Sequence, residues 1–245
     1  MKKFHSILIA SMVLVTLSLP AQIPGLDKKM EQMSKTLGNQ MQNQIMISMA
    51  RALFGYTFSV GGYWLWPTEI KNGDWWKYQL TDDEGNKLLV EIAKLRTDAK
   101  GNQWWRMGYY PLDEENNEPF IYEILVDPSM ENLLRMRAKM GDEKPTEIPV
   151  TENTKSFFMK PSKPTDESIK AATKGIETVK VPAGTFRAKH IVYGFQTGSK
   201  IEWWTSKKVP SGVIKYRITG DDGKVVYFSE LHSFGGKAKT ILGSY

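Results

Sequence analysis

Few residues in this sequence are of the types that carry out acid–base or metal chemistry. Apart from one near the start, the histidines are His190 and His232. His190 alternates with Phe186 and Ala188 in a segment of period two, so we expect a hydrogen-bonded core histidine rather than a catalytic base. Glu230 and His232 are two residues apart in a similar segment and could form an acid–base or metal pair. Two candidate ligands make a weak metal site, however.

Sequence motifs of the common enzyme classes are absent. There is no G-x-S-x-G, H-E-x-x-H, P-loop or G-x-G-x-x-G pattern. The chain has no cysteine, which excludes disulfides, thiolate metal sites and a thiol nucleophile. A carboxylate pair for glycoside hydrolysis has no spacing signature, so the 27 acidic residues leave that chemistry formally open. We predict a protein that is not an enzyme and that has no metal or cofactor.

Three tryptophan doublets, Trp75-Trp76, Trp104-Trp105 and Trp203-Trp204, are the most distinctive feature of the sequence. Neighbouring side chains on a strand point to opposite faces of a sheet, so one face cannot take both members. One member of each doublet alternates with apolar residues, which predicts a strongly apolar face. The residues assigned to this apolar face are Trp76, Tyr78, Trp105, Met107, Tyr109 and Trp203.

The other members, Trp75, Trp104 and Trp204, alternate with charged residues such as Lys77 and Arg106. We expect them on a second, polar face of the sheet. Aromatic rings on a polar face could bind a polysaccharide or a protein partner. The alternative is that they only cap the outer surface or the edge of the sheet.

The doublets belong to a chain that is rich in short strands. Segments of period two, separated by Gly, Asn and Asp, predict about ten strands joined by short turns in an antiparallel meander. The expected strands are 56–66, 74–80, 87–95, 103–110, 120–126, 133–140, 176–181, 185–195, 199–206, 213–219 and 224–234. Residues 133–140 alternate strictly, which favours a strand over a helix. Four prolines mark 142–164 as a crossover, lid or linker, and Thr165 or Asp166 caps a short helix that Gly175 ends.

A sheet of this many strands curls or closes. The predicted fold is therefore mainly β (α+β), with a strongly curved antiparallel sheet, or open half-barrel, over residues 55–234. Apolar residues at steps of three or four between Leu26 and Leu53 predict a long amphipathic helix within 22–54 that packs on this sheet. Residues 235–245 form a C-terminal tail. The patterns leave open whether the core is filled or contains a cavity.

The start of the chain has the pattern of a secretory signal peptide over residues 1–21. Two lysines precede an apolar run, Ile7–Leu19, that is shorter than the roughly 20 residues needed to span a membrane. Without residues 1–21 the chain has 31 basic and 27 acidic residues, a net charge of +4, which is too mild to suggest nucleic acid. We expect an exported, soluble protein of the periplasm or cell envelope with no integral membrane segment.

Part of the sequence resembles a known group of exported bacterial proteins. The stretches VKVPAGTFRAKHIVYG, IEWWTS and VPSGVIKYRITGDDGKVVYFSEL, between Val179 and Leu231, combine a Val-Pro-Ala-Gly-Thr-Phe turn, a tryptophan strand and a Pro-x-Gly-Val-Ile-Lys segment. This combination is similar to the outer-membrane lipoprotein-carrier-like (Lol-type) superfamily, with its uncharacterised periplasmic domain families. The resemblance implies an open, curved antiparallel barrel with helices over its mouth and an apolar cavity for acyl chains. It carries over no activity and no residue role.

Two functions are compatible with these patterns. The leading hypothesis is a carrier or chaperone that binds a lipid or an acylated protein in a cavity under the helix, lined by the six residues of the apolar face. The alternative is a non-catalytic interaction module that binds envelope polysaccharide or a protein partner through Trp75, Trp104 and Trp204.

Overall fold

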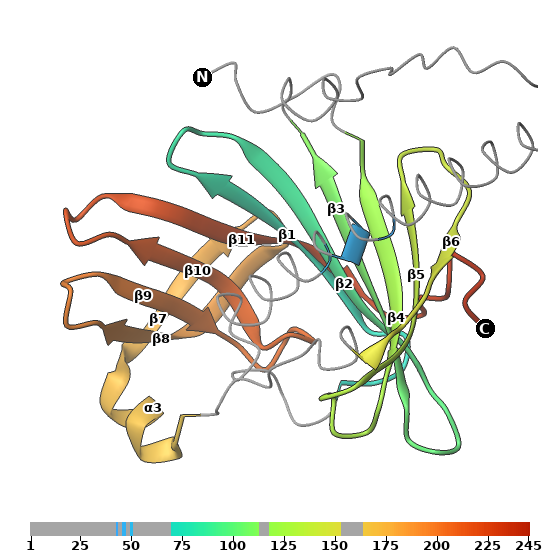
Figure 1. Ribbon diagram of the computed structural model, residues 1–245. Helices are drawn as coiled ribbons and strands as arrows, with labels where there is room; N and C mark the ends of the chain where they lie inside the picture. The colour runs from blue at the N-terminus through green and yellow to red at the C-terminus, as the bar shows by residue number, and fades with distance from the viewer. Residues whose placement is uncertain (1–42, 44–45, 48–49, 51–69, 113–117, 153–163) are drawn as a thin grey trace, which may run out of the picture. The chain divides into compact units, whose positions relative to one another are not determined.

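The computed structural model describes residues 43, 46, 47, 50, 70–112, 118–152 and 164–245 (Figure 1). All of these residues belong to one compact unit, Asn43–Tyr245. The expected signal peptide, most of the expected helix within 22–54 and the expected strand 56–66 lie outside the described residues. Residues 43, 46, 47 and 50 are helical, as expected for that part of the chain.

The described strands form one open antiparallel sheet. They are β1 (Trp75–Asp82), β2 (Lys87–Thr97), β3 (Gln103–Pro111), β4 (Phe120–Val126), β5 (Leu133–Met140), β6 (Thr146–Ile148), β7 (Thr173–Val181), β8 (Gly184–Gly194), β9 (Lys200–Thr205), β10 (Val213–Thr219) and β11 (Val225–Gly235). The order across the 11-stranded sheet is β6-β5-β4-β3-β2-β1-β11-β10-β9-β8-β7. The edges are therefore β6 and β7.

This order consists of two meanders placed side by side. Each strand from β1 to β6 pairs with the next along the chain, as does each strand from β7 to β11. The pairing of β1 with β11 joins the two meanders, and their adjacency is visible at the centre of Figure 1. The register shifts between Lys77 and Tyr78, where β11 contains one extra residue. Such a bulge bends the strand locally and increases its twist.

The expected strands within the described residues are confirmed to within three residues at each end. The segment 133–140 is a strand, as its strict alternation indicated. Sequence reasoning missed β6, which is only three residues long and lies inside the proline-rich segment 142–164. The mainly β, antiparallel fold is therefore confirmed as one open sheet, and its closure into a strongly curved half-barrel stays a prediction. The turn between β7 and β8 also contacts β11, which is not its neighbour in the sheet order. The backbone N–H of Ala183 donates to the carbonyl oxygen of Leu231, with an N···O distance of 3.0 Å.

Two hairpin turns of the first meander are closed by the same pair of side chains. In the β1–β2 turn, Asp82 accepts hydrogen bonds from the backbone N–H and the side-chain amide of Asn86, both at 2.9 Å. Asp98 and Asn102 repeat this arrangement between β2 and β3. The side-chain hydrogen bond from the asparagine is the main cause that holds the pKa of each aspartate below its ordinary value. These carboxylates therefore stabilise turns.

The helix α3 (Asp166–Ala172) precedes β7 and has the expected cap. Its N-cap, Thr165, accepts a hydrogen bond from the backbone N–H of Ser168 at 3.1 Å. The hydroxyl of Ser168 is 3.0 Å from that of Tyr193 in β8. This hydrogen bond places α3 against the same side of the sheet as the Tyr193 side chain.

Tyr78 connects the two meanders through a buried hydroxyl. Its O–H group in β1 lies 2.8 Å from the hydroxyl of Ser211 and 2.8 Å from the carbonyl oxygen of Val213, both in the second meander. Burial raises the pKa of Tyr78 above its ordinary value of 10.0, and the hydrogen bond with Ser211 offsets only part of this increase. The hydroxyl is therefore protonated and able to donate at neutral pH.

We predict that Tyr78→Phe lowers the free energy of unfolding by about 1–2 kcal/mol, because it leaves buried acceptors without their donor. Ser211→Ala should have a smaller effect, and the double variant should lose less than the sum of the two. Urea denaturation of the four proteins measures this coupling. Strict additivity would show that the hydroxyl contact does not hold the meanders together.

Candidate ligand-binding face

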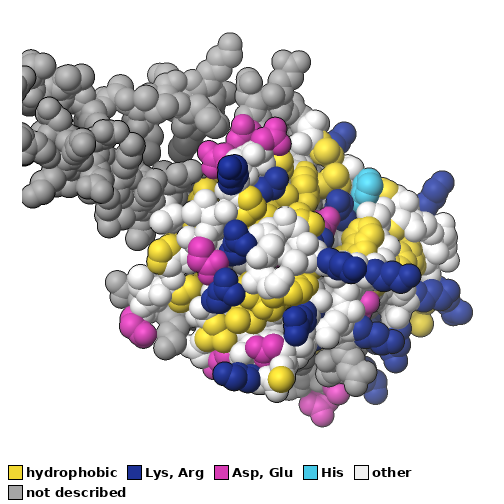
Figure 2. Space-filling view, turned by 90° about the vertical axis from the view of Figure 1, so that its right-hand side faces the viewer, with side chains coloured by type: hydrophobic (Ala, Val, Ile, Leu, Met, Phe, Trp, Pro, Cys, Tyr) yellow, Lys and Arg dark blue, Asp and Glu magenta, His cyan; other side chains and the backbone are white. Residues whose placement is uncertain are grey.

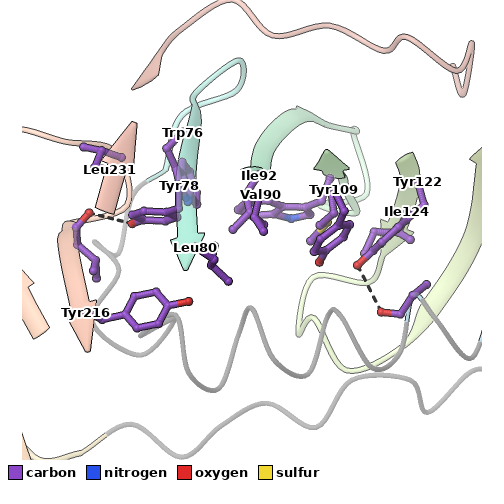
Figure 3. Close-up of a cluster of buried hydrophobic side chains, with 14 of the residues drawn as sticks. Trp76, Tyr78, Leu80, Val90, Ile92, Tyr109, Tyr122, Ile124, Tyr216 and Leu231 are labelled. Carbon is purple, nitrogen blue, oxygen red and sulfur yellow. Dashed lines mark hydrogen bonds between the residues drawn. The ribbon is translucent and has the colours of Figure 1, made fainter. Parts of the chain in front are cut away.

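The six residues expected on the apolar face lie together in the hydrophobic core. They are Trp76, Tyr78, Trp105, Met107, Tyr109 and Trp203, and none is more than 3% exposed. The rings of Trp76 and Trp105 meet edge to face, with centroids 6.4 Å apart. Figure 3 shows Trp76, Tyr78 and Tyr109 on the same side of the sheet, together with side chains of β2 and β4. The period-two phasing of these strands is therefore confirmed.

Cross-strand pairing extends this face beyond the six predicted residues. Met107 in β3 lies opposite Ile92 in β2 and opposite Tyr122 in β4. In the second meander, Tyr216 lies opposite Trp203. Sequence reasoning did not assign Tyr122 and Tyr216 to the face, although both alternate with apolar residues in their own strands. The apolar side chains consequently form a continuous face from β5 to β9.

The described helical residues pack on this apolar face. Met46, Ile47 and Ala50 are buried in the same hydrophobic cluster as the sheet residues. The hydroxyl of Tyr122 donates to the backbone oxygen of Ala50 at 3.4 Å, a long and therefore weak hydrogen bond. Burial, with a smaller effect of Tyr109, raises the pKa of Tyr122 well above its ordinary value. The hydroxyl of Tyr122 thus stays uncharged at neutral pH.

The tryptophans expected on the polar face are mostly covered. Trp104 is 4% exposed and packs against the ring of Tyr245, with centroids 5.9 Å apart, and the guanidinium of Arg135 lies 5.3 Å from its centre. Trp75 is partly exposed and lies against Gly235, where an added Cβ would come within 2.9 Å of the indole nitrogen. The C-terminal segment therefore covers two of the three rings.

Trp204 is covered from within the sheet. It is 6% exposed, and the ring of His190 stacks on it with centroids 4.4 Å apart. Its indole N–H donates to the carboxylate of Glu177. The guanidinium of Arg217 lies 5.5 Å from the ring centre. Of the two alternatives that the sequence left open for the outer tryptophans, burial favours surface caps over free rings.

Acidic and basic residues, together with one histidine, cross this polar face, one or two from every described strand. In sheet order from β6 to β7 they are Glu147, Arg137, Glu123, Arg106, Glu91, Lys77, Glu230, Lys215 with Arg217, Glu202, His190 and Glu177. We refer to these residues as the charge ladder. Opposite charges on neighbouring strands attract across the 4.5–5.5 Å between facing Cβ atoms. Figure 2 shows one side of the molecule, where basic and acidic side chains are likewise interspersed.

Two buried carboxylates of the charge ladder, Glu91 and Glu202, form short ion pairs. Glu91 lies 3.0 Å from Lys77 and 2.7 Å from Arg106. In the second meander, Glu202 lies 2.7 Å from Arg217 and 3.2 Å from His190. Burial by itself raises the pKa of Glu91, but Arg106 and then Lys77 outweigh this and hold the pKa below its ordinary value of 4.5. These carboxylates are therefore occupied by their cationic neighbours.

Glu123 is the most buried member of the charge ladder and binds the C-terminal segment. Its side chain is fully buried, 3.9 Å from Arg106. It accepts hydrogen bonds from the hydroxyl of Thr240 at 2.5 Å, the backbone N–H of Ile241 at 2.8 Å and the hydroxyl of Ser244 at 2.6 Å. Sequence reasoning treated 235–245 only as a tail. In the structure the segment after β11 satisfies a buried carboxylate.

The two histidines considered as chemical groups have structural surroundings. His190 is hydrogen-bonded, as predicted, but it lies in the charge ladder between Glu177 and Glu202 rather than in an apolar core. The pairing of Glu230 with His232, which the sequence allowed only as a weak site, is not formed. His232 is the extra residue of the bulge in β11 and is exposed, whereas Glu230 binds Lys215 at 2.8 Å. Strict alternation could not reveal this bulge.

Among the residues of the described part of the chain, no group of three or more His, Asp or Glu side chains is arranged to hold a metal ion. No helix in the described ranges is long and apolar enough to cross a membrane.

Comparisons with known proteins give distant structural similarity alone. No family matches the sequence, and no curated protein does. A Pseudomonas aeruginosa MucA/MucB complex contains a similar chain, with TM-score 0.41 and 10% identity over 70% of this chain and 54% of that one. A Bacteroides fragilis protein with a YmcC-like fold gives 0.37 and 10% over 69% and 99%. An uncharacterised conserved protein of Thermus thermophilus gives 0.37 and 13% over 70% and 82%. Similarity at this level assigns no family.

We predict that Glu123→Gln lowers the free energy of unfolding by about 3 kcal/mol. The change removes the negative charge beside Arg106, and the neutral amide cannot accept hydrogen bonds from all three donors of the C-terminal segment as the carboxylate does. The matched control is Glu147→Gln at the exposed end of the charge ladder, which should change stability by less than about 1 kcal/mol. Chemical denaturation measures both. Equal effects of the two changes would contradict a special role for the buried carboxylate.

The depressed pKa of Glu91 predicts a pH dependence of stability. A carboxylate with a lower pKa in the folded state stabilises the protein above its unfolded pKa, and this stabilisation disappears as the pH falls through the folded value. The free energy of unfolding should therefore decrease more steeply below pH 4.5 in the wild type than in Glu91→Gln. Denaturation curves between pH 3 and pH 7 test this, and parallel pH profiles would argue against it.

Proposed function

We propose that the protein is an exported, non-catalytic binding protein of the cell envelope that holds a lipid or acyl chain against the apolar face of its sheet. One observation carries this proposal: aromatic and aliphatic side chains of β1–β5 and β9–β11 lie on a single, continuous face, where Lys94 near Trp105 is a charged member. The helical residues Met46, Ile47 and Ala50 contact this face. The export signal is a sequence-based part of the proposal, since residues 1–21 lie outside the described ranges.

The chemistry of the apolar face suits a flexible hydrocarbon chain. Burial of each methylene group contributes about 0.8 kcal/mol, so an acyl chain supplies ample affinity without specific polar contacts. Met46 and Met107 are unbranched and adapt to irregular partners. A curved sheet with a cavity under the helix, as the resemblance implies, would be the natural container for such a ligand.

A non-catalytic role is supported by the state of the polar face. Its buried carboxylates, Glu91, Glu123 and Glu202, are bound by cations or hydrogen-bond donors. A general acid or base needs a group that can approach a substrate. Interaction through the outer tryptophans is the less favoured alternative, because Trp104 and Trp204 are already covered by other side chains. A partner would have to displace those side chains first.

We predict that Trp105→Phe weakens binding of a fluorescent fatty acid severalfold, because it removes part of the buried aromatic surface that contacts the chain. The matched control is Trp75→Phe on the opposite face, which should leave the dissociation constant unchanged. Circular dichroism and thermal melts of both variants separate binding from stability.

Intact-mass measurement of the native protein complements this titration. A co-purified lipid that Trp105→Phe retains poorly would support the proposal. The proposal fails if the wild type binds neither the fluorescent fatty acid nor any co-purified lipid.

A further inference from the structure

The apolar face of the sheet changes character at the β7–β8 hairpin. On β8, Ile191 is 1% exposed and lies opposite Trp203, a member of the apolar face. Two residues earlier, on the same side of the strand, stands Lys189. Lys189 in turn lies opposite Ile176 of β7, which is 61% exposed. The side that is apolar and buried elsewhere is thus basic and exposed at this end.

The cations of this hairpin differ from those of the charge ladder. Lys174, Lys180, Arg187 and Lys189 are all exposed, and none forms an ion pair with another of the described residues. The acidic residue of the hairpin, Glu177, is on the opposite side, where it binds Trp204 and lies 3.6 Å from His190. Positive charge on the apolar side is therefore not neutralised within the hairpin. We refer to these four cations as the basic lip.

A hollow lies between the basic lip and helix α3. Its volume is about 480 Å³, and its lining includes Lys170, Lys174, Lys189 and one acid, Asp166. The contact of Ser168 with Tyr193 places α3 over the side of β8 that carries Ile191 and Lys189. In Figure 1 the helix is seen below β8, at the lower left of the sheet. The hollow consequently adjoins the end of the apolar face.

We propose that the ligand is an anionic amphiphile, whose phosphate or carboxylate headgroup binds in this hollow at the basic lip while its chain extends along the apolar face. This inference rests on the proposed function and adds the ligand class to it. A headgroup that bears negative charge would find three lysines in the lining, and a neutral or zwitterionic headgroup would gain less from them. A basic lip beside an apolar face orients such a molecule in one direction only.

Two lipids with the same chain test the proposal. Oleoyl lysophosphatidic acid carries an anionic phosphate, and oleoyl lysophosphatidylcholine carries a zwitterionic headgroup. The mature protein should bind the first about tenfold more tightly at low salt, and the preference should shrink as salt screens the lysines. Lys174→Gln/Lys189→Gln should remove the preference and leave the affinity for the choline lipid unchanged. The control variant is Lys100→Gln/Lys144→Gln. These two lysines are exposed and do not line the hollow, so the variant should retain the preference for the phosphate lipid.

The outcomes separate the headgroup site from the proposed function. The headgroup site is overturned if the wild type binds the two lipids with equal affinity. It is also overturned if Lys174→Gln/Lys189→Gln still prefers the phosphate lipid. In both cases the proposed lipid binding itself stands. Binding of neither lipid overturns the proposed function itself. Inorganic phosphate is the third probe: if it binds the wild type as tightly as the phosphate lipid does, the hollow is a site for a free anion and the headgroup proposal fails.

Discussion

The register of strand pairing is the constraint on which the rest of the structure depends. Side chains alternate with a period of two, so a slip of one residue in any strand would move its apolar side chains to the polar face and its charge into the core. The charge ladder opposes such slips, because a slip would separate its short ion pairs, such as those of Glu91 with Lys77 and of Glu202 with Arg217. The constraint is strongest at Glu123 and Glu202, whose carboxylates are almost completely buried.

The two faces of the sheet are stabilised in different ways. The apolar face is stabilised by burial of aromatic and aliphatic side chains. The polar face is stabilised by mutual pairing of its charges, and the segment after β11 covers part of it by binding Glu123 through Thr240, Ile241 and Ser244. The same segment also covers Trp104 through Tyr245, which explains why Trp104 is buried although it lies on the polar face. The basic lip differs from both faces, because its cations are exposed and Lys189 lies on the side of the sheet that is apolar elsewhere.

Most of the secondary structure in the described ranges could be predicted from local pattern. Alternation predicted the strand 133–140 in a segment whose composition suits a helix, and Thr165 predicted the start of α3. Alternation also assigned Trp76, Trp105 and Trp203 to one face, since period two is a direct consequence of strand geometry. The bulge in β11 was invisible for the same reason: a bulge breaks the period, and here it makes His232 the extra, exposed residue of the strand.

The sequence by itself determined the strands, their alternation and the separation of apolar from polar side chains, because these depend on residues two positions apart. Only the tertiary structure decided which strands are neighbours. The pairing of β1 with β11 brings together residues more than 140 positions apart, and no local pattern encodes that contact. For the same reason the charge ladder could not be read along the chain: its members are spread over all the described strands, and their order exists only across the sheet.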